Sequence, residues 1–372
     1  MKTVSLVGAR PQFIKLAPVS RAMAAARESG GPAIEDIIVH TGQHYDPGLS
    51  DVFFSELEIP TPDVHMGVGS GSHGLQTARM LEGIERVLND HAPDMLVVYG
   101  DTNSTVAGAL AAAKLHVPIA HVEAGLRSFD RRMPEEVNRI VSDHISELLL
   151  APTETAMANL KAENLADRAR LVGDVMLDAV RFNTGLARRS SDILSRLTLE
   201  GEPFGIVTMH RASNTDSGRL RILLDTLNAI ARNLIPLVFP VHPRTVSQIK
   251  SAHSDWNPVA GLRLIEPVGY LDMLRLMESA RLVLTDSGGL QKEAFFLNVP
   301  CVTLRDETEW VETVSAGGNR IAGADPERIL ESAEAMLAAA DAGVEYDAEQ
   351  YFGDGKAAEA IVREIVGWNG KA

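Results

Sequence analysis

The sequence has almost no cysteine and no long uncharged apolar run. Cys301 is the only cysteine among 372 residues, so no disulfide can form within the chain. Its apolar neighbours predict a buried strand thiol in a reducing compartment. No window approaches the roughly 18 uncharged apolar residues of a membrane-spanning helix. The first apolar run, residues 3–7, turns polar too early for a secretory signal. We therefore expect a cytoplasmic protein with no membrane insertion.

The chain also lacks a surplus of basic residues. It carries 35 lysines and arginines against 50 acidic residues, a formal net charge of -15, and it contains no lysine/arginine block. This balance argues against nucleic acid or an anionic membrane as the main partner, but it is compatible with a local basic site for a small anion. The length predicts two domains, each large enough to bury a core without disulfides or a structural metal.

Short apolar runs alternate with longer helical patterns along the chain. The runs lack the period-two alternation of half-exposed strands, so they indicate strands buried on both faces, joined by helical crossovers into parallel sheets. The predicted strands are residues 3–7, 37–40, 95–99, 119–122, 148–151 and 170–172, then 206–209, 237–240, 262–265, 282–285 and 302–304. We expect an α/β protein with two Rossmann-like, doubly wound domains.

The domain boundaries follow from a change in composition. Residues 1–180 form the predicted first domain, and the polar stretch 181–203 is the predicted linker. Residues 204–350 form the second domain. Residues 351–372 carry a closing helix with apolar residues spaced by four, and we expect this helix to pack back on the first domain.

In open parallel sheets, ligands bind beyond the carboxyl ends of the strands, so polar residues at these ends are candidates for a site. The segment Thr285-Asp-Ser-Gly-Gly289 leads from a strand into a helix, where free N–H groups and glycines can cradle a phosphate. A plain helix cap with a turn glycine is the competing interpretation. Arg10 is a candidate for a second phosphate contact, and a solvated loop arginine is its alternative.

The acid/base candidates are Asp101, Glu123, Glu135, Glu136 and His210. Asp101 and Glu123 end neighbouring predicted strands, and for either alone a helix-capping carboxylate is the alternative. The two glutamates occupy the first turn of a predicted helix, where the helix dipole favours acidic residues without any catalytic role. His210 follows a strand directly and is either an acid/base group or a structural histidine.

Two short motifs match the patterns of a dinucleotide-binding site and of a metal site, but their surroundings in the sequence do not support either function. Residues 69–74 match G-x-G-x-x-G and precede a helical pattern, but no buried strand comes before them, and the acid Asp94 stands before a strand instead of ending one. His40 and His44 flank a strand-to-loop junction without a third ligand. We therefore expect neither a dinucleotide cofactor nor a metal.

Taken together, the strand ends resemble the non-hydrolysing UDP-N-acetylglucosamine 2-epimerases, from about residue 2 to 325. The matching segments, in chain order, are Gly8-Ala-Arg-Pro-Gln-Phe-Ile-Lys15, Thr41-Gly-Gln-His44, Gly100-Asp-Thr102, His121-Val-Glu-Ala-Gly-Leu-Arg127, Pro134-Glu-Glu-Val-Asn-Arg139, Ala151-Pro-Thr-Glu154, His210-Arg211, Thr285-Asp-Ser-Gly-Gly-Leu-Gln291 and Arg305-Asp-Glu-Thr-Glu309.

The resemblance implies a fold, an assembly and a reaction. The fold is a GT-B architecture with a central cleft, and the assembly is a homodimer. The reaction interconverts UDP-GlcNAc and UDP-ManNAc by anti-elimination of UDP to 2-acetamidoglucal and re-addition, which supplies ManNAc units for surface polysaccharide. The C2–H is barely acidic, so its removal must be coupled to C1–O cleavage by a positioned base and a stabilised leaving diphosphate.

The resemblance also implies residue roles, without a cofactor. The residues matching the catalytic positions are Asp101, Glu123, Glu135, Arg139 and His210. Those matching UDP- or sugar-binding positions are Arg10, Lys15, Arg211, Ser287, Gly288, Gly289 and Glu293. In some family members a second UDP-GlcNAc activates the enzyme through positions matching Gln43, Arg211 and His242, but Asp46 stands where a further glutamine contact is expected.

Three positions depart from the commonest family pattern: Gln12 replaces a frequent glutamate, Trp310 begins a replacement of Arg-Pro, and Ser213 stands where glutamate is usual. These departures leave alternatives open. One is a 2-epimerase of a modified UDP-hexose, such as a 2,3-diacetamido glucuronate. The others are a GT-B glycosyltransferase using a UDP-sugar donor and a non-catalytic UDP-sugar-binding module.

Overall fold

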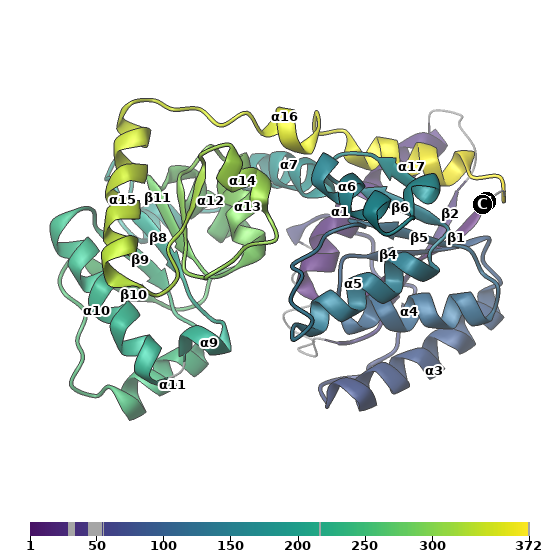
Figure 1. The fold of residues 1–372 in the computed structure, drawn as a ribbon, viewed down its shortest axis with the longest axis horizontal. Helices are drawn as coiled ribbons and strands as arrows, with labels where there is room; N and C mark the ends of the chain where they lie inside the picture. The colour runs from purple at the N-terminus through teal and green to yellow at the C-terminus, as the bar shows by residue number, and fades with distance from the viewer. Residues whose placement is uncertain (29–33, 44–53, 55, 216, 371–372) are drawn as a thin grey trace. The chain divides into compact units, whose positions relative to one another are not determined.

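The computed structural model describes residues 1–28, 34–43, 54, 56–215 and 217–370 (Figure 1). The chain divides into two compact units: unit 1 comprises residues 1–179 and 349–372, and unit 2 comprises residues 180–348. The division falls inside helix α7, Val175–Ser190. The region expected as a linker, residues 181–203, is largely helical because α8, Ile193–Arg196, follows α7.

Unit 1 is built on a parallel sheet with the strand order β3-β2-β1-β4-β5-β6-β7. Its elements are β1 (Lys2–Val7), α1 (Arg10–Glu28), β2 (Glu35–His40), β3 (Val64–His65), α3 (His73–His91), β4 (Met95–Tyr99), α4 (Asn103–Lys114), β5 (Ile119–Val122), α5 (Pro134–Ile145), β6 (Leu148–Ala151), α6 (Glu154–Ala162), the 3₁₀ turn η1 (Ala166–Arg168), β7 (Ala169–Leu171), the start of α7, and the returning helices α16 (Ala348–Phe352) and α17 (Ala357–Gly367).

The core of unit 1 explains why these helices lie on the sheet. Val4 and Leu6 of β1 point to one face, where they pack with Met80 and Ile84 of α3 and with α4. Helix α4 contains glycine and alanine at its buried positions, so its backbone approaches the strands closely. Burying each large aliphatic side chain contributes roughly 1.5–3 kcal/mol. Helices α1 and α17 cover the opposite face (Figure 1).

Unit 2 repeats this design with the strand order β10-β9-β8-β11-β12-β13. Its elements after α8 are β8 (Gly205–Thr208), α9 (Ala212–Thr215), α10 (Ser217–Asn233), β9 (Leu237–Pro240), α11 (Pro243–Ala252), β10 (Leu262–Ile265), α12 (Tyr270–Ser279), β11 (Leu282–Thr285), α13 (Gly288–Phe296), β12 (Cys301–Thr303), α14 (Val311–Ser315), β13 (Asn319–Ile321) and α15 (Pro326–Asp341). Helices α10 and α15 pack side by side over one main core (Figure 1).

The predicted strands are confirmed, with bounds that agree to within two residues. The sequence did not indicate β3 and β13, which are short and lie at one edge of each sheet. Cys301 is fully buried on β12, and burial raises the pKa of its thiol to about 12. Across the described ranges no helix is long and apolar enough to span a bilayer.

The closing helix α17 joins the far end of the chain to unit 1. Its residues Ala357, Ile361 and Ile365 recur every fourth position and are buried where α17 packs on α1. Asp178 of α7 accepts the N–H groups of Ala357 (3.0 Å) and Ala358 (3.3 Å), so it satisfies two of the donors that a helix start leaves unpaired. This contact fixes where α17 begins.

The buried carboxyl of Asp36, next to β1, makes the stability of the protein depend on pH. Asp36 of β2 accepts the hydroxyls of Thr3 (2.7 Å) and Ser5 (2.9 Å), and burial raises its pKa to about 6. In the unfolded chain the Asp36 carboxyl loses its proton near pH 3.8, whereas in the folded protein it keeps the proton up to about pH 6. The free energy of unfolding therefore falls as the pH rises from 3.8 to about 6. Asp36→Asn keeps the acceptor oxygen and cannot ionise. We expect it to raise the free energy of unfolding at neutral pH by roughly 1–3 kcal/mol.

Urea unfolding of both proteins at a series of pH values measures this effect. The gain should shrink to nothing as the pH falls towards 4, where wild-type Asp36 is itself protonated. Asp90→Asn on the exposed side of α3 is the control and should show no such gain. A gain from Asp36→Asn that did not change with pH would contradict the assignment.

Candidate functional site

In both sheets the strand order reverses between two adjacent strands, β1 and β4 in unit 1 and β8 and β11 in unit 2. Doubly wound sheets bind their ligands beyond the carboxyl ends of the strands at such a reversal. The loops that leave these ends begin at Gly8 and Gly100 in unit 1, and at Met209 and Asp286 in unit 2. The predicted site residues in or directly after these loops are Arg10, Asp101, His210, Arg211 and residues 287–289.

Gln12 bridges the reversal point of unit 1. Its Oε1 accepts the N–H groups of Gly8 (2.8 Å) and Ala9 (3.1 Å), and its Nε2 donates to the Tyr99 carbonyl (2.8 Å) and to Thr105 Oγ1 (3.1 Å). The amide thus holds the loop after β1 against the end of β4. An ionised glutamate has no proton to give to the Tyr99 carbonyl, so glutamine at this position matches its surroundings.

Asp101 and Arg139 form the first charged pair of the site. Arg139 of α5 donates to Asp101 Oδ2 through Nε (2.9 Å) and Nη2 (2.5 Å), and through Nη1 to Glu136 (3.1 Å). Asn138 donates to the Asp101 carbonyl (2.9 Å). The Asp101 side chain keeps 27% of its surface exposed, whereas Arg139 keeps 5%. Arg139 and Asn138 therefore hold Asp101 on its buried side, and the exposed part of its carboxylate remains accessible to a ligand.

Lys15 and Glu123 form the second pair, in which the ammonium donates to Glu123 Oε2 and both side chains are buried. Glu123 has φ +69°, a left-handed conformation that costs a non-glycine residue roughly 1–3 kcal/mol. It persists only where the surroundings enforce it. Glu123 follows β5, which pairs with β4, so the two predicted strand-end carboxylates lie on neighbouring strands.

Gly100 directly precedes Asp101 and lies close to the Lys15–Glu123 pair, so a larger residue there should disturb the site. It has φ +61°, and a Cβ there would lie 3.0 Å from Lys15 Nζ and 3.3 Å from Glu123 Oε2. Gly100→Ala should therefore displace the Lys15–Glu123 pair and lower turnover by about 10²-fold, the loss expected from a misplacement of about 1 Å. Steady-state kinetics with the UDP-sugar that the family resemblance implies measures this loss.

Gly67→Ala is the matched control for this variant. Gly67 has nearly the same φ, +62°, but a Cβ there meets no atom within 4 Å. It therefore introduces the same backbone strain without touching the charged pairs, and its turnover should stay near wild type. Equal losses in the two variants would show that strain, and not the displaced pair, causes the effect.

The two glutamates at the start of α5 have different surroundings. Glu136 is buried and accepts the N–H groups of Ser128 and Phe129, both at 2.9 Å. Burial alone would raise its pKa, but these hydrogen bonds and the Arg139 charge lower it. Glu136 therefore closes the preceding loop. Glu135 is exposed, and no partner for its carboxylate occurs within the described ranges.

Sequence reasoning missed a buried network beneath these pairs. His121 contacts Asp143 of α5, Asp143 contacts Arg127, and Arg127 pairs with Glu163. One signal for it was present in the sequence. Arg139 and Asp143 are four residues apart, which places them on one face of α5.

The remaining candidates of unit 1 lie around the same sheet edge. Arg10 is exposed at the first residue of α1. Gln43, after β2, accepts the Ser104 N–H (3.0 Å) and hydroxyl (2.8 Å). His44 and Asp46 lie outside the described residues.

Asp286 bridges the reversal point of unit 2. The fully buried carboxylate accepts the N–H groups of His210 (3.1 Å) and Arg211 (3.0 Å) and the amide of Asn214 (3.0 Å), and it pairs with His210 Nδ1 (3.2 Å). Burial would raise its pKa, but His210 and these donors lower it. It thus anchors the loop after β8 while the His210 side chain stays 56% exposed.

The segment after β11 forms an open helix start. Ser287 is the N-cap of α13 and makes no side-chain capping hydrogen bond within the described structure, so the plain-cap interpretation does not describe this helix. A Cβ at Gly288 would lie 2.3 Å from Glu309 Oε1, whereas one at Gly289 would meet nothing nearer than Ser287 Oγ at 3.9 Å. Gly288 therefore permits close packing, and exposed Gly289 leaves the helix start open to an anion.

The other unit 2 candidates and departures surround this helix. Glu293 is buried on α13, and His242 is exposed after β9. Trp310 is buried, and Lys292 Nζ lies 3.6 Å from its ring centroid, so the departure at Trp310 supplies a cation–π contact to α13. Ser213 is exposed on α9.

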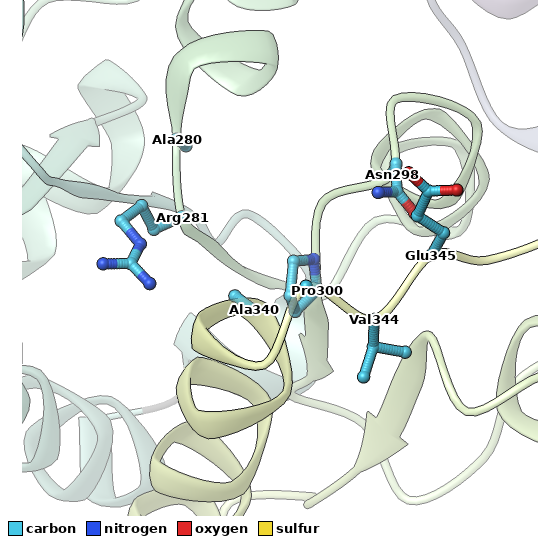
Figure 2. A pocket seen from close by; sticks show the side chains of 8 residues that line it. Ala280, Arg281, Asn298, Pro300, Ala340, Val344 and Glu345 are labelled. Carbon is cyan, nitrogen blue, oxygen red and sulfur yellow. The ribbon is translucent and has the colours of Figure 1, made fainter.

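A pocket of unit 2 lies at the amino ends of its strands, opposite the carboxyl ends that carry the predicted site residues (Figure 2). Its wall includes Arg281 and Pro300, which directly precede β11 and β12, and Ala340 and Val344 from the end of α15 and the turn after it. It contains none of the predicted site residues. Because ligands of such sheets bind at the carboxyl ends, we do not assign the substrate to this pocket. No cluster of three or more potential metal ligands occurs in the described part of the chain.

Comparison with known proteins adds independent findings. Residues 27–366 match the family model described as UDP-N-acetylglucosamine 2-epimerase. A Methanococcus maripaludis protein named UDP-N-acetylglucosamine 2-epimerase homolog is 51% identical over 335 residues, 89% of this chain and 91% of its own. The UDP-2,3-diacetamido-2,3-dideoxy-D-glucuronate 2-epimerase of Pseudomonas aeruginosa is 47% identical over 373 residues, 98% of this chain and 99% of its own.

The fold is similar to that of a solved structure. The Methanocaldococcus jannaschii UDP-GlcNAc 2-epimerase, solved in complex with UDP-GlcNAc and UDP, superimposes with a TM-score of 0.88 at 40% identity, covering 99% of this chain and 100% of that one. The predicted GT-B fold class is confirmed.

Proposed function

The chain belongs to the UDP-N-acetylglucosamine 2-epimerase family, and we propose that it interconverts UDP-GlcNAc and UDP-ManNAc. The family predicted from the strand-end motifs is thus correct, and the protein is an isomerase. The observation that carries the substrate proposal is the pairing of acids with bases at the carboxyl edge of the first sheet, Asp101 with Arg139 and Glu123 with Lys15.

The proposed reaction proceeds by elimination and re-addition. A carboxylate of the group Asp101, Glu123 and Glu135 removes the proton at C2, the C2–H electrons form the C1=C2 double bond, and the C1–O electrons leave with UDP. The intermediate is 2-acetamidoglucal. UDP then adds back to C1 while C2 takes a proton on its other face. Two carboxylates in different surroundings suit this step, because removal and return of the proton occur on opposite faces.

The leaving diphosphate needs positive charge and N–H donors. We assign these to the start of α13 at Ser287, Gly288 and Gly289, and to Arg10 and Arg211. Glu293 is assigned to UDP, and Lys15 and Arg139 position the carboxylates against the sugar. His210, exposed beside the helix start and anchored through Asp286, is assigned to the departing phosphate.

Further parts of the proposal rest on the family resemblance. We propose a cytoplasmic homodimer whose product supplies ManNAc units for surface polysaccharide, with the first domain at residues 1–180, the second at 204–350 and the closing helix at 351–372. Gln43 and His242 are proposed contacts for an activating UDP-GlcNAc. Light scattering of the purified protein and a sigmoidal dependence of rate on UDP-GlcNAc test the dimer and the activation.

A second substrate is supported by one observation. The P. aeruginosa relative named for UDP-2,3-diacetamido-2,3-dideoxy-D-glucuronate is 47% identical over nearly the whole chain. This sugar differs from UDP-GlcNAc at C3 and C6 but undergoes the same chemistry at C2, so the residues assigned here would serve either substrate. The ratio of kcat/KM values for the two UDP-sugars decides between them.

One experiment tests the reaction itself. The purified protein is incubated in D₂O with each of the two UDP-sugars, and the C2 proton is followed by NMR. Deuterium at C2 together with the manno epimer supports the proposal. Free ManNAc with accumulating UDP would mean hydrolysis. No exchange with either sugar would overturn the proposal, and transfer of the sugar to an added acceptor would then identify a glycosyltransferase.

A further inference from the structure

His121 lies at the centre of unit 1 with a hydrogen-bond acceptor at each ring nitrogen. Nε2 is 2.7 Å from the Gly100 carbonyl oxygen, and Nδ1 is 2.7 Å from Asp143 Oδ1. The ring has no exposed surface. A carbonyl oxygen can only accept, and so can an ionised carboxylate. If Asp143 is ionised, both ring nitrogens must therefore carry a proton.

The surroundings of Asp143 keep it ionised. Its Oδ2 accepts from Arg127 Nη1 (2.7 Å) and from the Gly125 N–H (3.1 Å). The Arg127 guanidinium always carries a charge, so this contact holds the carboxylate in its ionised form independently of His121. Arg127 pairs in turn with Glu163 (2.7 Å). Two cations and two anions therefore alternate from His121 to Glu163, whose side chain keeps 26% of its surface exposed, and this row is neutral with His121 as an imidazolium.

The network touches the chain beside both candidate carboxylates. Gly100, which accepts from His121, directly precedes Asp101, and Gly125, which donates to Asp143, comes two residues after Glu123. Gly100, Glu123 and Gly125 all have positive φ, at +61°, +69° and +84°. Such turns persist when the surrounding structure over-determines them, and Asp143 contacts one directly and another through His121.

We infer that Asp143 is a positioning residue. It keeps His121 as an imidazolium that donates to the Gly100 carbonyl, and it accepts the Gly125 N–H itself. These two contacts fix Asp101 and Glu123 relative to each other. Asp143 touches neither substrate nor reacting atoms. Arg139, which holds the Asp101 carboxylate, lies one turn before Asp143 on α5. One face of α5 therefore positions the Asp101 carboxylate through Arg139 and the backbone at Gly100 and Gly125 through Asp143. The catalytic consequence rests on the proposed function, but the protonation state does not.

Nitrogen NMR of histidine-labelled wild-type protein tests the protonation state without any activity. The His121 signals are identified by their loss in His121→Gln. Because both ring nitrogens face an acceptor, we expect both His121 ring nitrogens to carry slowly exchanging protons. A ring with one unprotonated nitrogen would overturn the inference. This result is independent of whether any UDP-sugar is epimerised.

Kinetics of Asp143→Asn test the positioning role. Asparagine keeps the shape but removes the charge that holds the imidazolium. We expect kcat to fall by about 10²-fold, with KM and calorimetric UDP affinity nearly unchanged because the proposed diphosphate contacts lie mainly in unit 2. His121→Gln should lower kcat similarly, and the double variant should be no worse than either single one, because the two residues act as a unit.

Glu163→Gln is the matched control, since it removes a charge from the same network at the end away from Gly100 and Gly125. It should retain near wild-type kcat. Equal losses in Glu163→Gln and Asp143→Asn, or multiplied losses in the double variant, would show that the network contributes only general stability. If Asp143→Asn does not fold, His121→Gln and the nitrogen NMR decide alone.

Discussion

Replacing Glu123 with glutamine, or Asp101 with asparagine, is expected to lower the rate of proton exchange at C2 by roughly 10²–10⁴, the loss of a positioned acid/base group. Both changes keep the side-chain shape but remove the carboxylate that we propose takes up the proton. Glu123→Gln also leaves the Lys15 ammonium buried without its counter-ion. We therefore expect it to be the more damaging of the two. Deuterium incorporation at C2, followed by NMR, is the direct measurement.

Binding separates a lost catalytic group from a lost fold. The proposed UDP contacts at the start of α13 are in unit 2, so both variants should bind UDP in calorimetry with near wild-type affinity. Glu85→Gln, on the exposed side of α3, is the control and should exchange the C2 proton normally. Near wild-type exchange in both Asp101→Asn and Glu123→Gln would disprove the assignment.

Replacing Asp286 with alanine is expected to weaken UDP binding by 10- to 100-fold, equivalent to about 1.4–2.7 kcal/mol. The change leaves the N–H groups of His210 and Arg211 without their acceptor and removes one of the two acceptors of the Asn214 amide, and each buried unsatisfied donor costs about 1–3 kcal/mol. The loop after β8 should then no longer present His210 and Arg211 to the diphosphate. Calorimetry with UDP measures the affinity, and thermal unfolding measures the accompanying loss of stability.

Asp306→Ala is the matched control for Asp286→Ala. Asp306 lies at the same edge of the same sheet, but its side chain is 77% exposed and its pair with Arg219 spans 3.5 Å. Exposed pairs contribute about 0–1 kcal/mol, so this variant should bind UDP and unfold like wild type. If Asp286→Ala bound UDP normally, the loop after β8 would not contribute to the nucleotide site.

Much of the sheet framework could be predicted from the sequence, for a physical reason. Strands buried on both faces are continuous apolar runs, and a run such as residues 95–99 has no other plausible structure between two helical patterns. The adjacency of Asp101 and Glu123 followed from this alternation. The strands β3 and β13 were missed because two or three residues at a sheet edge carry no recognisable period.

The details of the site depended on contacts that no local pattern encodes. The Gln12 side chain joins the loop after β1 to the end of β4, which are far apart in the sequence, so only the folded sheet shows why glutamine suits the position. The same holds for His121 and Asp143, which meet across β5 and α5. By contrast, the burial of Glu136 and the exposure of Glu135 could have been inferred, because Glu136, Arg139 and Asp143 share one face of α5.

The return of α17 to unit 1 affects the order in which the protein can fold during synthesis. The chain emerges from the ribosome from its N-terminus, and whole domains generally fold as they are completed. Here the apolar side of α1 has no cover from Ile361 and Ile365 until all of unit 2 has been made. The N-terminal part of unit 1 therefore remains partly uncovered until α17 has been synthesised. We therefore expect a disruptive substitution in α17 to cause misfolding of α1, the helix that carries Gln12.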